Sequence, residues 1–379
     1  MLKTGLLASG AVAFSLAVSG ALAQAEGDTV VLGAAVSLTG KYSVNGKNTK
    51  DGYDLAVKRI NEMGGVKVGG KAYKLKVLYY DDESTPKAIA PVTEKYKVPH
   101  VEGNGAAREL FTQGYRYLFA VLSTSDYYLR DAVNLAAEVA KEKGRDPKTL
   151  KIAMVFENDP FSLDVREGIL EDAKRYGMHV AIDDKLPPEI NDMAPTLTKV
   201  RAVKPDMLLV SGHEKGATLV VRQTAEMKIE VPIVATTHCD SAKIAESMGK
   251  LAEGVLCASQ WDRKLAYKDK WFGSADDYAK LFEKELKYPA PYQAAESTAS
   301  VLVFADAFAR AGSLDPEKVR DAIASTDMMT FFGPIKFDST GKNVVKPMVL
   351  YQVLGGDYKV VAPTKWAETK LVWPRKLPQ

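Results

Sequence analysis

The residues best suited to bind a ligand lie in loops that directly follow apolar runs. In the clearest of these loops, residues 102–106 (EGNGA), two glycines follow a short apolar run that begins at Val98. Good helix formers come next, so the pattern predicts a strand, a glycine turn and a helix over residues 98–110. The free N–H groups and the positive dipole end of such a helix favour an anion. We therefore expect Asn104, Gly105 and Ala106 to anchor one.

Polar and aromatic residues fill five more loops at the same place, just past a predicted strand. Ligands of open α/β sheets bind outside the carboxyl ends of the strands. The group therefore predicts a polar pocket for a small molecule, although each residue alone is equally typical of an ordinary turn. The candidate ligand-binding residues in these loops are Tyr42, Phe161, His213, Glu214 and His238.

Metal and enzyme sites have weaker support. His213, His238 and Cys239 are chemically able to bind zinc, but their spacing matches no standard ligand pattern, and we expect no metal. The GNGAAR sequence resembles part of a dinucleotide fingerprint but lacks its third glycine and the acidic residue that would bind ribose. The chain has no G-x-S-x-G elbow, H-E-x-x-H or Walker motif. We expect a non-enzymatic protein without a cofactor.

Alternating strands and helices would position these loops. Three apolar runs in the first part, at 30–36, 74–80 and 98–102, alternate with helical patterns and predict one mostly parallel sheet. The pattern indicates an α/β fold of two doubly wound parallel-sheet units, followed by helices and short antiparallel strands. The strands predicted for the second unit lie at 151–156, 179–182, 206–210, 231–236 and 254–259.

Composition bears on the compartment and the partners. Residues 5–22 form an apolar run rich in alanine and leucine, and Ala23-Gln24-Ala25 fits the small-x-small cleavage rule. We interpret residues 1–25 as a cleaved export signal, with a membrane anchor as the alternative, and expect a periplasmic protein. The 51 basic and 48 acidic residues nearly balance, which argues against a nucleic-acid partner. Cys239 and Cys257 are able to pair in an oxidising compartment or to remain two buried thiols.

Taken together, these features resemble the type I periplasmic solute-binding proteins of the branched-chain amino acid ABC importers. The resemblance covers essentially the whole chain after the export signal, and no single motif would suffice alone. It is carried by the stretches VLGAAVSLTGKYSVNGKNTKDGYDLAVKRINEMGG, LYYDDESTPK, APVTEKYKVPHVEGNGAARELFTQGYRYLF, YQAAESTASVLVFADAFARAGSLDPEKVRDAI and TFFGPIKFDSTGKNVVKPMVLYQV.

The resemblance implies two lobes that close on a ligand by a hinge motion and then dock on a membrane permease. Three strands would cross between the lobes, near 119–122, 257–260 and 326–330. Lobe 1 would comprise residues 26–119 and 260–327, and lobe 2 would comprise 120–259 and 328–379. We expect a monomer whose partners are a small-molecule ligand and the permease.

Site residues follow from the resemblance position by position. Asn104, Gly105 and Ala106 match the turn that holds the ligand carboxylate, and Phe161 matches a pocket aromatic. A second aromatic falls at His213 or Glu214, and Tyr42 approximately matches the loop at the mouth. In leucine-binding relatives an acid binds the α-amine, and that position falls at Thr237 or His238 here.

Two departures from the family pattern bear on the ligand. Relatives carry a helix, a strand and a serine-containing loop that this chain lacks after Lys87. The amine-binding acid is also replaced, by His238. We expect a hydrophobic or branched-chain amino acid as the ligand. The alternatives are an aromatic or other small carboxylate without an α-amine, and a sensor that presents its ligand to a receptor or kinase.

Overall fold

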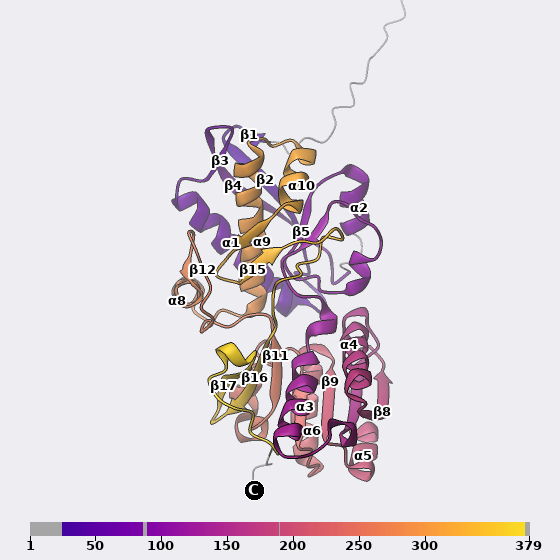
Figure 1. Ribbon diagram of the computed structural model, residues 1–379. Coiled ribbons are helices and arrows are strands. Elements are labelled where there is room, and N and C mark those ends of the chain that lie inside the picture. Colours follow the sequence, from indigo (N-terminus) through magenta and orange to yellow (C-terminus); the bar gives the residue numbers. More distant parts are fainter. Residues whose placement is uncertain (1–24, 86–88, 189, 376–379) are drawn as a thin grey trace, which may run out of the picture.

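The computed structural model describes residues 25–85, 89–188 and 190–375 of the chain. This part forms two α/β lobes, which lie one above the other in Figure 1. The predicted α/β class with two lobes is confirmed, with one correction in the first lobe given below. Most of the predicted export signal, residues 1–24, lies outside the described residues. Within those described, no helix has the length and apolar character that a membrane crossing requires.

The lower lobe in Figure 1 is built on a seven-stranded sheet in the order β17-β16-β11-β10-β9-β7-β8. The strands from β11 to β8 in this order are parallel, while β16 and β17 are antiparallel. Every residue of β9 is buried, as expected for an apolar strand between two layers of helices. The strands are β7 (Lys151–Glu157), β8 (His179–Leu186), β9 (Met207–Ser211), β10 (Ile233–Thr236), β11 (Leu256–Ser259), β16 (Val349–Leu354) and β17 (Asp357–Ala362).

Helices connect the parallel strands of this sheet, and their ends follow standard capping rules. Asp159 accepts a hydrogen bond from the N–H of Ser162 at the start of α4, and Pro160 occupies its first turn. Gly177 ends α4 in the left-handed conformation that glycine tolerates. The helices are α3 (Arg130–Glu142), α4 (Pro160–Tyr176), α5 (Ala194–Val203), α6 (His213–Glu226) and α7 (Ile244–Met248).

The upper lobe holds a smaller sheet in the order β1-β2-β4-β3. Strands β2 and β4 are parallel, and β1 and β3 add antiparallel edges. The strands are β1 (Ala25–Glu26), β2 (Thr29–Val36), β3 (Val66–Val68) and β4 (Lys71–Asp81), and the helices are α1 (Ser43–Glu62), α2 (Ile89–Tyr96), α8 (Ala275–Leu286), α9 (Tyr292–Ala311) and α10 (Pro316–Ala324).

Helices α1 and α9 touch each other through their backbones. Gly52 of α1 lies so close to α9 that a Cβ atom there would overlap the carbonyl oxygen of Ala294. Thr298 of α9 donates a hydrogen bond from Oγ1 to the carbonyl oxygen of Gly52 at 2.8 Å. Only glycine permits this approach at position 52.

The prediction that residues 30–36, 74–80 and 98–102 share one sheet is wrong. The third strand, β5 (His100–Glu102), pairs instead with β6 (Leu118–Ala120) in a separate two-stranded parallel sheet. Alternation of strands and helices fixes the order of elements along the chain but does not specify which strands are neighbours. Among the described residues, no strand joins β2 to β5.

The predicted helix over residues 106–110 is also wrong. The segment contains a single 3₁₀ turn, η2 (Arg108–Phe111), preceded by Ala107 in an extended conformation. So short a turn has no substantial dipole, because the dipole grows by aligning peptide units over several turns. The remaining 3₁₀ turns are η3 (Ser125–Tyr127), η4 (Pro147–Thr149), η5 (Gly249–Ala252) and η6 (Thr364–Trp366).

The segments predicted to cross between the lobes lie beside one another. The N–H of Ser123 donates to Oε1 of Gln260 at 3.1 Å, and Nε2 of Gln260 donates back to Ser123 O at 2.8 Å. Nε1 of Trp261 donates to Phe331 O at 3.0 Å. The domain boundaries themselves stay a prediction. The short strands near this junction are β12 (Lys268–Asp269), β13 (Gly273–Ser274), β14 (Asp327–Met329) and β15 (Pro334–Lys336).

Candidate functional site

Four predicted site residues come together between the lobes. Phe161 follows β7, His213 follows β9 and His238 follows β10, three strands that are adjacent in the sheet. The ring centroid of Phe161 lies 5.4 Å from that of His213 and 5.2 Å from that of His238, and the two histidine rings are 5.0 Å apart. From the other lobe, the ring of Tyr42 lies 5.2 Å from that of His213.

This ring cluster lines one end of a cavity of about 780 Å³. Asn104, Gly105 and Ala106 also line the cavity, whose other end extends into the first lobe. Glu214 does not line it. Seven of the eight predicted ligand-binding residues therefore border one cavity, which has the size of a small-molecule site.

Both histidines have an unusual backbone conformation. His213 has a φ of +52° and His238 a φ of +58°, in the left-handed region that residues other than glycine rarely occupy. Residues held in this region are concentrated at ligand sites, where the surrounding structure compensates the strain.

His238 is a neutral, buried group with a free hydrogen-bonding atom. Its Nδ1 is buried and has no hydrogen-bond partner among the described residues. Burial lowers the pKa of His238 to about 4, although the negative charge of Glu214 opposes this shift. At neutral pH the ring is therefore uncharged, and Nδ1 is available to a ligand as a donor or an acceptor, depending on the tautomer.

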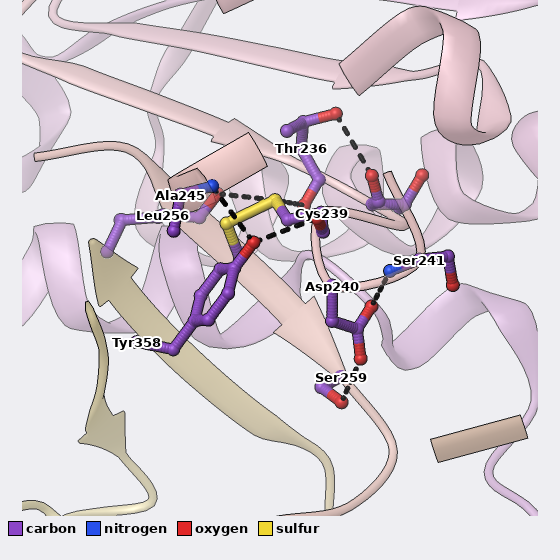
Figure 2. Close-up of a disulfide and its surroundings, with 10 residues drawn as sticks. Thr236, Cys239, Asp240, Ser241, Ala245, Leu256, Ser259 and Tyr358 are labelled. Atoms are coloured by element: carbon purple, nitrogen blue, oxygen red, sulfur yellow. Dashed lines mark hydrogen bonds between the residues drawn. A yellow bond between two sulfur atoms is a disulfide. The ribbon is translucent and has the colours of Figure 1, made fainter. Parts of the chain in front are cut away.

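A disulfide holds the loop that carries His238, and Figure 2 shows this bond with its surroundings. Cys239 is bonded to Cys257 of β11, and their Cα atoms lie 5.6 Å apart. Tyr358 Oη donates a hydrogen bond to the carbonyl oxygen of Cys239 at 2.9 Å. Of the two alternatives open from the sequence, the structure has the paired cysteines. Because the Cys239 sulfur is bonded in this way, the zinc set of His213, His238 and Cys239 is excluded.

Asp159 carries a negative charge at the edge of the ring cluster. Its Oδ2 lies 3.2 Å from Nε2 of His213 and accepts a hydrogen bond from Ser162 Oγ at 3.2 Å. Burial alone would raise the pKa of Asp159, but His213, the N–H of Ser162 and Lys41 outweigh it and hold the pKa below its usual value. The carboxylate is thus ionised and already partnered.

An ion pair joins the two lobes at the mouth of the cleft. Lys41, beside Tyr42 in the first lobe, pairs with Glu157 at the end of β7. Ligand atoms of Glu157, Asp159 and His213 lie within 4.8 Å of one another, close enough to hold a metal ion. A cation there would have to displace the Lys41 ammonium group, and so we assign no metal to this group.

The glycine turn is occupied by a carboxylate from the same chain. The N–H of Gly105 donates to Oε2 of Glu102 at 2.9 Å, and Nε2 of His100 lies 3.3 Å from Oε1 of Glu102. Burial raises the pKa of Glu102, but His100 and the amides of Asn104 and Gly105 outweigh it, so the pKa lies below its usual value. Nδ2 of Asn104 donates to Thr49 Oγ1 at 2.6 Å. The turn does bind a carboxylate, as its sequence predicts, but that carboxylate is Glu102.

Sequence reasoning missed the contribution of helix α9 and of Tyr128. Tyr292 and Tyr128 line the cavity, and the ring of Tyr128 lies 4.9 Å from that of Phe161. Glu296 is buried, and neither of its carboxylate oxygens has a hydrogen-bond partner among the described residues. Burial raises the pKa of Glu296 well above its usual value, although Lys346 opposes this shift. The polar residues in Tyr292-Gln293-Ala294-Ala295-Glu296, at the start of an apolar helix, are the signal that could have revealed the α9 residues; no such signal marks Tyr128.

Comparison with known proteins places this geometry in context. A sequence model described as "Periplasmic binding protein" matches residues 87–357. The Leu/Ile/Val-binding protein homolog 8 of Brucella abortus is 24% identical over 221 residues, which are 52% of this chain and 55% of the relative. The chain thus matches about half the length of this relative. Homolog 7 of the same organism is 21% identical over 400 residues, covering 96% of this chain and 99% of the relative. Since 400 exceeds the chain's 379 residues, homolog 7 carries residues without a counterpart here.

Two solved structures have the same fold. One is LivJ of Streptococcus pneumoniae in complex with isoleucine, with a TM-score of 0.73, 19% identity and coverage of 91% of this chain and 100% of that chain. The other is a solute-binding protein of an ABC transporter from R. palustris in complex with benzoate, with a TM-score of 0.71, 16% identity and coverage of 93% and 98%.

Proposed function

We propose that this chain, which belongs to the periplasmic binding protein family, captures a hydrophobic or branched-chain amino acid as the solute receptor of an ABC importer. Its two α/β lobes have the type I fold of that family. The observation that carries the proposal is the ring cluster of Phe161, His213 and His238 at three adjacent strand ends, closed from the other lobe by Tyr42. The proposed role is binding without catalysis, by a monomer in the periplasm that delivers its ligand to a membrane permease.

Hinge closure would trap the solute, and three contacts support it. With the lobe boundaries at 26–119 plus 260–327 and at 120–259 plus 328–379, each contact joins one lobe to the other. Lys41 pairs with Glu157. The N–H of Arg108 donates to Asp164 Oδ2 at 2.6 Å, and Gln293 Nε2 donates to Ser241 Oγ at 2.5 Å. All three would break when the lobes separate, so this arrangement corresponds to the closed state of the receptor.

The cleft offers a group for each part of an amino acid. The apolar side chain would pack against the rings of Phe161 and Tyr128. The ammonium group would face the carboxylate of Asp159 and the surrounding ring faces. The carboxylate would accept a hydrogen bond from Nδ1–H of the neutral His238. Tyr42 would cover the ligand from the first lobe.

An aromatic carboxylate is the second candidate ligand, and the partners of Asp159 favour it. This carboxylate already accepts from Ser162 and faces His213, so it has little capacity left for a ligand ammonium group. A ligand without an amine would need only the ring cluster and the donor on His238. The benzoate complex of the R. palustris protein has the same fold.

A thermal-shift panel on the chain from residue 26 would test both ligand classes. Leucine, isoleucine, phenylalanine and benzoate would each be titrated, because a ligand at 100 times its Kd stabilises the folded state by about 2.7 kcal/mol. The Phe161→Ala variant should lose the shift, while Tyr127→Ala, which removes an exposed ring outside the cavity, should keep it. The proposal fails if no compound of either class moves the transition of the natural chain.

A further inference from the structure

The inner part of the 780 Å³ cavity is bounded by the edges of two strands. Every residue of β2 from Val30 to Val36 lines it, and so does every residue of β5. Successive side chains of a strand point to opposite faces, so an unbroken run of lining residues means that the cavity lies along the edge of the strand. The opposite edge of β2 pairs with β4, and that of β5 pairs with β6. The cavity therefore takes the place that a strand between β2 and β5 would have.

Backbone groups of both strands point into this part of the cavity. The carbonyl oxygen of Val36 accepts a hydrogen bond from the N–H of Asp82, on the β4 side, at 3.2 Å. Alternate residues of a strand direct their N–H and C=O groups to opposite sides, so those of Gly33 and Ala35 face the cavity. In β5, both neighbours of Val101 bond to the β6 side, and Val101 therefore presents its own N–H and C=O to the cavity.

Apolar side chains line the rest of this part of the cavity. Helix α9 contributes Val301, Phe304 and Phe308 to the lining. Tyr80 of β4 and Val92 of α2 also line the cavity, and they are 61% and 50% exposed, so the cavity reaches the surface of the first lobe. Facing rows of backbone N–H and C=O groups with apolar surroundings are what an extended peptide binds when it adds a strand to a sheet.

The cavity is larger than a single amino acid requires. Its 780 Å³ is the volume of about 26 water molecules in the liquid, whereas isoleucine has only nine non-hydrogen atoms. Cavities of this size ordinarily hold ligands as large as a drug molecule. An amino acid bound at the ring cluster would therefore leave the space between β2 and β5 empty.

The direction of the two strands decides which end of a peptide would reach the ring cluster. Tyr42 follows the carboxyl end of β2, the glycine turn follows that of β5, and both line the cavity. A peptide parallel to both strands would therefore present its C-terminal carboxylate to Nδ1 of His238. Its last residue would carry an amide in place of an ammonium group, which suits Asp159, a carboxylate already partnered by Ser162 and His213.

We propose that the cavity binds a short apolar peptide, extended between β2 and β5 and parallel to both, with its C-terminal carboxylate at the ring cluster. At about 3.3 Å per residue, the stretch of β2 beyond its pairing with β1 would accommodate about four to six peptide residues. Main-chain hydrogen bonds would supply affinity, and the apolar lining would select the side chains. This inference rests on the proposed role as a solute receptor and extends the solute from one hydrophobic amino acid to a peptide that ends in one.

Calorimetric titration of the exported protein with matched ligands tests the peptide site. The probes are leucine, the tetrapeptide alanyl-valyl-alanyl-leucine, and the same tetrapeptide with its peptide nitrogens methylated. We expect the tetrapeptide to bind at least tenfold more tightly than leucine. Methylation removes the N–H donors but keeps the side chains, so it should weaken binding at least tenfold.

The other outcomes of this titration separate the inference from the proposed function. Binding of leucine without tighter binding of the tetrapeptide, or equal binding of the methylated peptide, would overturn the peptide site alone. Decanoate, a carboxylate of similar length without amides, would overturn it as well if it bound as tightly as the tetrapeptide, because the site would then take an acyl chain. If neither leucine nor the tetrapeptide bound, the receptor role for this solute class would fail together with the inference.

Hydrogen exchange on the same protein locates the bound peptide without any substitution. Saturating tetrapeptide should slow exchange in the segment spanning residues 31–36 at least tenfold relative to the leucine-bound protein. Strand β8, at the outer edge of the sheet in the other lobe, is the matched control and should exchange equally in both. Equal exchange of residues 31–36 in the two bound forms would refute the placement between β2 and β5.

Discussion

Removing the disulfide between Cys239 and Cys257 should destabilise the protein and weaken ligand binding together. The two cysteines are 18 positions apart, and closing a loop of this length in the unfolded chain corresponds to about 3 kcal/mol at 25 °C in the chain-entropy description. Both residues are fully buried, so a variant with alanine at both positions would also lose some packing. We expect the free energy of unfolding to fall by about 3–4 kcal/mol.

Urea unfolding followed by circular dichroism would measure this loss as a lower midpoint. The natural chain unfolded in dithiothreitol is the matched control, because it loses the covalent bond but keeps both sulfur atoms. If the reduced natural chain unfolds at the same urea concentration as the oxidised chain, the loop-closure argument is wrong. A loss seen only in the alanine variant would identify packing as the cause.

Ligand affinity gives a second readout of the same variant, because the disulfide holds the loop that positions His238. Ordering a backbone residue costs about 1–2 kcal/mol, so a loosened loop that must be ordered on binding would weaken affinity roughly fivefold or more. Calorimetric titration with the best ligand of the thermal-shift panel would measure this change. Unchanged affinity in a destabilised variant would mean that the neighbouring hydrogen bond from Tyr358 to Cys239 O is sufficient to hold the loop.

Three further predictions concern single residues. His238→Ala should weaken ligand binding about tenfold by removing a buried hydrogen-bonding group, while His179→Ala, at an exposed strand position, should leave calorimetric affinity unchanged. Burial lowers the pKa of His238 to about 4 from its usual 6.5, so the unfolded chain binds this proton more tightly and the ring's contribution to stability is lost as pH falls from about 6.5 to about 4. The urea midpoint of the natural chain should therefore fall by more over this pH range than the midpoint of His238→Gln. Burial raises the pKa of Asp240 to about 7, so its contribution to stability changes with pH in the opposite direction, but it does so in both proteins. Gly52→Ala should lose about 1–3 kcal/mol of stability, because its Cβ atom would overlap the carbonyl oxygen of Ala294. The control Gly33→Ala, whose Cβ atom would meet nothing within 4 Å, should change stability by no more than about 0.5 kcal/mol. Equal urea midpoints for the two variants would contradict the close approach of α1 and α9.

The second lobe could be predicted well because its signals are local. Strands such as β9 are continuous apolar runs of strand length, and their burial on both faces follows from the helices between them. The positions of Phe161, His213 and His238 at strand ends were equally accessible, since parallel strands all present their carboxyl ends at one edge of a sheet. Their convergence followed from the fold class and the position of each loop.

The predictions that were wrong or incomplete depend on contacts between segments distant in sequence, or on which carboxylate binds to the glycine turn. The pairing of β5 with β6 rather than with the first sheet depends on which strands are neighbours, and alternation of elements does not encode that. The glycine turn was recognised as a carboxylate site, but the sequence did not indicate that Glu102, only three residues away from Gly105, would occupy it. Glu296 was missed because the polar residues at the start of α9 indicate a polar face on an apolar helix, but the groups that this face meets depend on tertiary packing.

The backbone contact between α1 and α9 has a consequence for how the cleft opens. Helix α1 begins directly after Tyr42 at the mouth of the cleft, and α9 begins at Tyr292 in its wall. Because Gly52 brings the two helices together without intervening side chains, they form one rigid body that carries both tyrosines. Tyr42 and Tyr292 would therefore move away from the solute together when the lobes separate. A fluorescent label on either α1 or α9 would then report the loss of both contacts.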